Sequence, residues 1–161
     1  MEKFQEARDK AKRNLQIADH MIYMTYNMVK DPKLLIVIME NIFLALTNAM
    51  SSVLYYEKFF KRIEPFPENF ESKFAIFQQE CVKKYNIDKS YILLIRDVKD
   101  FIFEHRQSAV EFVRKDRFVI CTDNYQMKAV SVDQIKRYIG ITKNFLQETA
   151  RIVSRDEEIL R

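Results

Sequence analysis

The sequence predicts a mainly α protein, a helical bundle of about five helices with one small β-hairpin before the C-terminal helix, in a single domain over residues 1–161. Three observations carry this prediction. First, Gly140 is the one glycine in 161 residues, whereas average usage is roughly 7%, so positive-φ turns are scarce and long helices are favoured. Second, apolar residues recur at steps of three and four over most of the chain. Third, only residues 117–131 show an alternating, β-branched and aromatic pattern.

The first helix is expected over residues 3–30, where Phe4, Ala7, Ala11 and later apolar residues share one face. Its later half carries a second apolar stripe, so we expect this end to be buried on two sides: Ile17, Met21, Met24 and Met28. Asp31-Pro32 ends the helix, because the residue before a proline avoids the α region.

The second helix is expected over residues 32–62 and contains the uninterrupted apolar run 34–39. A membrane span is one interpretation of this segment. However, Glu40, Asn41, Thr47 and Asn48 recur at seven-residue offsets and form a polar stripe on one face. A charged Glu inside a span also costs on the order of 3 kcal/mol. The sequence therefore favours the central helix of a soluble bundle, with no membrane partner.

Three further helices follow, at residues 67–85, from Asp88 to about Phe112, and from Ser131 to about residue 155. Asp88 suits an N-cap, and Ser131 with Gln134 has the spacing of a capping box. Between the last two helices, residues 117–122 and 125–130 predict the strands of a hairpin that turns at 123–124. Gly140 falls inside the last helix, where we expect it to admit a close neighbour.

Composition excludes several classes of function. A single glycine rules out the P-loop, the Rossmann fingerprint and the G-x-S-x-G elbow. Cys81, Cys121, His20 and His105 cannot be combined into a disulfide framework or a zinc site, so no metal or cofactor is expected and both cysteines are interpreted as buried thiols. The charged N-terminus lacks an apolar signal core, which predicts a cytoplasmic protein.

His105 is the first candidate for chemistry, because it lies on the apolar face of the fourth helix beside Arg106. One interpretation is a general acid or base. The other is a hydrogen-bonded histidine at the edge of the core, since no ligand partner lies near it in the sequence. No other catalytic signal is present, and the sequence does not indicate an enzyme.

A group of cations around the predicted hairpin is the second candidate, with aromatic residues between them: Arg106, Arg114, Lys115 and Arg117. Cations interleaved with aromatic rings suit a single-stranded nucleic acid, in line with the net charge of +4. Glu111, Asp116 and Asp123 dilute this charge, so a solvated surface with local ion pairs is the alternative interpretation.

The segment Ala11-Lys-Arg-Asn-Leu15-Gln-Ile-Ala18-Asp, the small-residue segment Ala45-Leu-Thr-Asn-Ala49 and the late His105-Arg106 pair resemble the HEPN superfamily. The resemblance implies a helical bundle, commonly homodimeric, that acts either as a ribonuclease or as a non-catalytic module binding a nucleotide or a partner. The ribonuclease members carry an Arg followed four to six residues later by a His. Here Arg96 and His105 lie nine positions apart, on opposite faces of a helix, so the resemblance implies a catalytically degenerate member.

Three functions are therefore considered. The leading expectation is a non-catalytic HEPN-like interaction module, homodimeric through its helices and associated with nucleic acid through Arg106, Arg114, Lys115 and Arg117. The second is a metal-independent ribonuclease of the toxin–antitoxin type that uses His105 with Arg106. The third is a helical scaffold that binds a protein partner in an apolar groove.

Overall fold

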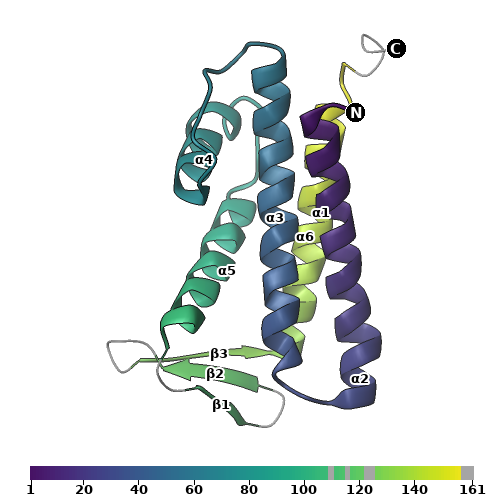
Figure 1. Ribbon diagram of the computed structural model, residues 1–161, viewed down its shortest axis with the longest axis vertical. Coiled ribbons are helices and arrows are strands. Elements are labelled where there is room, and N and C mark those ends of the chain that lie inside the picture. Colours follow the sequence, from purple (N-terminus) through teal and green to yellow (C-terminus); the bar gives the residue numbers. More distant parts are fainter. Residues whose placement is uncertain (109–110, 115–116, 122–125, 157–161) are drawn as a thin grey trace.

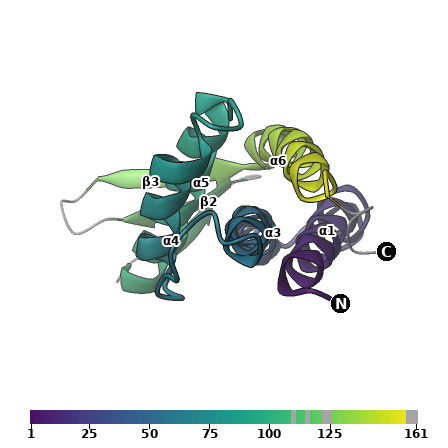
Figure 2. The same cartoon turned by 90° about the horizontal axis from the view of Figure 1, so that it is seen from above.

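The computed structural model describes residues 1–108, 111–114, 117–121 and 126–156, and it confirms the predicted fold class. Helix α3 (Leu34–Phe59) runs through the middle of the molecule (Figure 1). Helices α1 (Lys3–His20) and α6 (Val132–Val153) lie on one side of it, and α4 (Phe70–Ile76) and α5 (Lys89–Gln107) lie on the other. A small sheet lies at the end where α5 stops. Seen from above, α1 and α6 lie next to each other on the same side of α3 (Figure 2), so the axes of these three helices form a triangle.

The first helical segment combines α1 (Lys3–His20), the short π-helix η1 (Met21–Thr25) and α2 (Tyr26–Val29). Its buried face is the predicted one, from Phe4 to Tyr26. The prediction that its later half is buried on two sides is wrong for the single chain, because the second apolar stripe remains largely exposed. No other element of the described chain covers that flank, since α6 packs on the opposite flank of α1.

Helix α3 (Leu34–Phe59) packs against α1, α5 and α6 and contributes the largest share of the core. By length and composition it could cross a membrane, and 56% of its most apolar window is buried inside the chain itself. Such burial is also the pattern of a central helix that gathers the apolar faces of its neighbours.

The segments after α3 begin with side-chain caps. Asn69 accepts from the Ser72 amide at the start of α4 (Phe70–Ile76), and Asp88 accepts from the Ser90 amide at the start of α5 (Lys89–Gln107), both at 2.8 Å. A wide turn, η2 (Phe77–Cys81), extends α4. The predicted N-cap at Asp88 is thus confirmed. Ser131 caps α6 (Val132–Val153) by accepting from the Gln134 amide at 3.2 Å. The Gln134 side chain donates instead to the Tyr138 hydroxyl at 2.7 Å, so only the serine half of the predicted capping box is present.

The structure contains left-handed turns although the chain has almost no glycine. Lys30, Lys61 and Asn86 take φ values of 53°, 59° and 52° at the ends of helical segments. Gly140 instead lies exposed inside α6, and a Cβ placed there meets nothing within 4 Å. The prediction that Gly140 admits a close neighbour is therefore wrong.

The sheet has three antiparallel strands in the order β1 (Glu111–Arg114), β2 (Arg117–Cys121) and β3 (Met127–Ser131). The β2–β3 pair is the predicted hairpin, whose turn at 123–124 lies outside the described residues. The additional strand β1 corrects the prediction that the fourth helix continues to Phe112. Residues 111–114 pair along β2, and these backbone hydrogen bonds prevail over the helical spacing of Phe112.

Candidate functional site

His105 lies in the last turn of α5, where its Nδ1 is 2.8 Å from the Glu111 carboxylate at the start of β1. Its ring also meets the ring of Phe118 edge-on, with 5.6 Å between centroids. The side chain is 20% exposed, so it lies at the edge of the core. This geometry joins the end of α5 to the sheet and orients the imidazole.

The other predicted site residues are spread along the sheet. Arg106 is exposed, and its guanidinium lies 5.6 Å from the centre of the Phe103 ring. Arg117 is exposed at the start of β2, which spans about 13 Å to its other end at 3.3 Å per residue. The end of α5 adjoins that other end, since the Ser108 hydroxyl donates to the Cys121 carbonyl at 3.0 Å. Arg106 and Arg117 therefore lie at opposite ends of the strand.

Two members of the predicted cationic group are described only in part or not at all. The backbone of Arg114 pairs directly with that of Arg117 across β1 and β2, and Lys115 lies outside the described residues. Lys128, on β3, is ion-paired with Glu104 at 2.8 Å. Of the described cations near the sheet, Arg106 and Arg117 are thus exposed, whereas Lys128 is ion-paired.

A cluster of polar side chains at the opposite end of the bundle was not anticipated from the sequence. The Glu57 carboxylate, 1% exposed, accepts hydrogen bonds from the Tyr85 hydroxyl and from Lys84 Nζ, the latter at 2.7 Å. Arg62 Nη1 lies 3.6 Å from Glu57, and Arg62 Nη2 lies 3.4 Å from Asp156. The Tyr56 hydroxyl also donates to Asp156. The cluster thereby joins the ends of α3 and α6 to the segment after η2.

A turn at the end of α3 places Arg62 in this cluster. Lys61 takes the left-handed conformation, and the Arg62 amide donates to the Glu57 carbonyl at 2.9 Å, as in a Schellman motif. The neighbouring pocket has a volume of about 390 Å³ and is lined by Tyr56, Arg62, Lys84, Tyr85, Arg155 and Asp156.

Burial raises the pKa of two groups in or beside this cluster. For Tyr85 a further cause of the raised pKa is its hydrogen bond to the Glu57 carboxylate. For the Cys81 thiol the pKa rises to about 12, again with a contribution from Glu57. A general acid or base works best with a pKa near the operating pH. The Tyr85 hydroxyl and the Cys81 thiol are therefore poorly suited to proton transfer at neutral pH.

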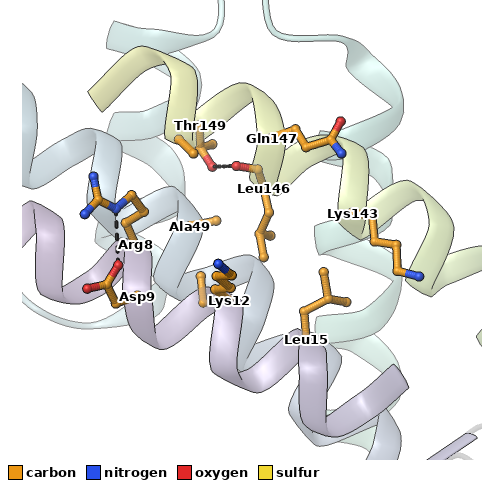
Figure 3. A pocket seen from close by; sticks show the side chains of 11 residues that line it. Arg8, Asp9, Lys12, Leu15, Ala49, Lys143, Leu146, Gln147 and Thr149 are labelled. Atoms are coloured by element: carbon orange, nitrogen blue, oxygen red, sulfur yellow. Dashed lines mark hydrogen bonds and ion pairs between the residues drawn. The ribbon is translucent and has the colours of Figure 1, made fainter. Parts of the chain in front are cut away.

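A cleft of about 490 Å³ opens between α1 and α6. Ala49 of α3 lies at its floor, and Leu15 and Leu146 approach it from the two flanking helices (Figure 3). The cleft is also lined by cationic residues, Arg8 and Lys12 from α1 and Lys143 from α6. Arg8 and Lys12 are one helical turn apart beside the apolar face of the first helix, which is the signal that the sequence offered for this cleft.

The outer flank of the first helical segment (α1, η1 and α2) and of α3 carries a second exposed feature, which we call the apolar strip. Its large exposed members, with their exposed fractions, are Ile17 (47%), Met24 (55%), Met28 (83%), Val37 (40%) and Leu44 (46%). Asn14 and Asn48 meet on this flank, where the Asn48 amide donates to Asn14 at 3.0 Å. Because α1 and α3 run antiparallel (Figure 1), the strip residues of the first helical segment lie beside those of α3.

The fold and these surfaces define a helical-bundle protein with a cleft between α1 and α6 and an exposed apolar strip. No family model matches the chain, and comparisons with curated proteins and with solved structures find no match either. Among the described residues, no group of three or more His, Cys, Asp or Glu side chains could hold a metal ion.

Proposed function

We propose that this protein is a non-catalytic interaction module that works as a homodimer, assembled through the apolar strip. The observation that carries the proposal is the exposure of five large apolar side chains along one flank of two adjacent helices. Exposed apolar side chains that cluster in this way mark interaction surfaces, whereas single exposed ones need no explanation.

The spacing of the strip supports a helical partner. On the first helix the residues follow steps of three and four from Asn14 through Ile17, Met21 and Met24 to Met28. On α3 the same steps lead from Leu34 through Val37, Asn41 and Leu44 to Asn48. This is the heptad pattern by which helices pack knobs into holes. The segment η1 interrupts the helical period, yet Met24 within it and Met28 beyond it both remain exposed.

A second copy of the chain fits this surface. When the first helix and α3 pack against the same two helices of a second copy across a two-fold axis, the four helices form one interface. In it, the apolar strip of one copy contacts the apolar strip of the other. The heptad positions carry no charge, because their polar members are asparagines, so the two-fold arrangement does not place like charges opposite each other along the strip. Asn41 already donates one hydrogen bond, to the Val37 carbonyl at 3.0 Å. Such buried amides commonly fix the register of helix pairing.

Sedimentation equilibrium over the micromolar range tests the proposal. The wild-type chain is expected at twice its monomer mass, and Leu44→Glu should produce a monomer, because a buried unpaired charge opposes association. Leu93→Glu is the matched control, since Leu93 on α5 is 44% exposed but lies outside the strip. A wild-type chain that remains monomeric, or dimers unaffected by Leu44→Glu, would overturn the proposal. A monomeric chain that binds a different helical protein through Leu44 would also overturn the proposal, because the apolar strip would then bind another protein and not a second copy.

Association with nucleic acid is the second candidate function, and the exposed Arg117 at the start of β2 supports it. An exposed arginine can contact a phosphate of a nucleic acid. Binding of a single-stranded oligonucleotide should then fall steeply with salt, and Arg117→Glu should weaken it. Equal binding by Arg117→Glu at low salt would exclude this site.

A further inference from the structure

The floor of the α1/α6 cleft is aliphatic and offers no free hydrogen-bonding group. Ala11 and Leu15 of α1, Ala49 of α3, and Leu146 and Ala150 of α6 supply its apolar surface. The one buried polar side chain there is Thr149, 2% exposed, whose hydroxyl already donates to the Leu146 carbonyl at 3.2 Å. A bound molecule would therefore contact this floor through apolar groups.

The rim of the cleft has an excess of positive charge. Three cations and one carboxylate line it: Arg8, Lys12, Lys143 and Asp9. Arg8 Nε lies 3.3 Å from Asp9, and Lys143 Nζ lies 3.1 Å from Asp19. Lys12 is exposed and has no ion-pair partner among the residues that the structure describes. Lys12 is thus available to an anion at the mouth of the cleft, with Lys143 across from it on α6.

We propose that this cleft binds a small amphipathic anion, namely a medium-chain aliphatic carboxylate. The chain would lie on the aliphatic floor, and the carboxylate would remain at the rim beside Lys12. Small-molecule sites commonly combine such an apolar lining with a few polar groups that set orientation.

The lining disfavours an aromatic or nucleotide ligand. No aromatic side chain lines the cleft, so a planar ring has nothing to stack on. Apart from the exposed Gln147 amide, no neutral side chain of the lining offers a free donor or acceptor to the edge of a base. Charge at the rim together with an aliphatic floor matches a fatty carboxylate, whose polar atoms are confined to one end.

The cleft is separate from the apolar strip. It lies on the flank of α1 that faces α6, whereas Ile17 and the Asn14–Asn48 contact lie on the flank that α6 leaves open. Binding in the cleft can therefore be measured in the Leu44→Glu variant, and failure of either proposal does not affect the other.

Titration of the full chain with octanoate tests the inference, followed by NMR of the alanine methyl groups. Octanoate is expected to shift the methyl signals of Ala11, Ala49 and Ala150, and octanol, which has the same chain length without charge, should bind more weakly. Lys12→Gln should weaken octanoate binding by up to about tenfold, the range of a charge-assisted hydrogen bond. Arg13→Gln is the control, because Arg13 is exposed on α1 and does not line the cleft.

A second variant tests whether octanoate occupies the cleft itself, because it fills the space without changing the charge. Ala150, partly exposed at the cleft, can be changed to Phe to fill the space, and the exposed Ala75 on α4 provides the control Ala75→Phe. Loss of the octanoate-induced shifts in Ala150→Phe, with the fold retained by circular dichroism, supports the site. Absence of shifts at millimolar octanoate in the wild type would overturn it. So would equal affinity for octanol, equal loss in the two controls, or a preference for adenine nucleotides.

Discussion

The Tyr85 hydroxyl donates a hydrogen bond to the Glu57 carboxylate, which is 1% exposed at the end of α3. This contact joins residues 28 positions apart and lies where three helical segments meet. Lys84 and Arg62 surround the same carboxylate, and both remain partly in water, with side chains 44% and 37% exposed. The charge on Glu57 is therefore buried, whereas its cationic partners stay hydrated.

Removing the Tyr85 hydroxyl should be costly because it leaves a buried carboxylate with one donor fewer. We expect Tyr85→Phe to lower the free energy of unfolding by about 2 kcal/mol, measured by urea denaturation. Tyr23→Phe is the matched control, since Tyr23 is 44% exposed and its hydroxyl has no hydrogen-bond partner among the described residues. Its effect should stay within about 0.5 kcal/mol. Equal effects in the two variants would contradict a stabilising role for the contact.

Gly140→Ala should stabilise the protein. The residue is exposed inside α6, and a Cβ there meets nothing within 4 Å, so the substitution adds helix propensity without a clash. We expect a gain of about 0.5–1 kcal/mol in the free energy of unfolding. The slope of that free energy against urea concentration should not change. A loss of stability would show that the site has a close neighbour after all, for example in the dimer.

The two thiols should differ in reactivity. Cys81 is fully buried, and burial raises its pKa to about 12, whereas Cys121 is only partly buried, contrary to its prediction as a buried thiol. Only the thiolate attacks an alkylating reagent. In the native protein at pH 8, mass spectrometry after iodoacetamide treatment should find Cys121 modified well before Cys81. Rapid labelling of both in the absence of denaturant would contradict the burial of Cys81.

Acid should weaken the ion pair between Lys3, at the N-terminus, and Glu68, in the loop before α4, whose atoms lie 3.3 Å apart. Hydrogen bonds from Lys73, then Tyr55, lower the pKa of Glu68 to about 2. A lowered folded-state pKa gives stability that is present above the unfolded value of roughly 4.3 and disappears as the pH falls toward the folded value.

Glu68→Gln should therefore flatten the loss of stability between about pH 4.3 and pH 2, and it should cost about 0.5 kcal/mol at pH 7, as is typical of exposed pairs. The Glu68 side chain is 53% exposed, which limits the effect through solvent screening. Glu71→Gln is the control, because Glu71 is 69% exposed with its nearest cation, Lys99, 3.9 Å away. An unchanged acid slope in Glu68→Gln, measured by thermal denaturation against pH, would refute the assignment.

The candidate surfaces could be predicted from the sequence only in part. The spacing of Ile17, Met21, Met24 and Met28 identified an apolar stripe, but whether it was buried or exposed depended on which flank α6 would cover. The cationic group around the hairpin was visible as residue types, yet the structure places Arg106 and Arg117 at opposite ends of β2. Glu57 gave no signal, since its partners come from other segments.

Local interactions allowed the sequence alone to determine the helical class, the approximate spans of five helical segments and the caps at Asp88 and Ser131. A capping side chain bonds an amide two or three residues away, and an apolar face repeats within one turn, so both are legible in a short stretch of sequence. Only the tertiary structure decided that Glu111–Arg114 forms a strand, that Glu57 is buried among cations, and that a cleft opens beside Ala49. Each of these depends on groups distant in the chain, whose meeting is set by packing and not by any local preference.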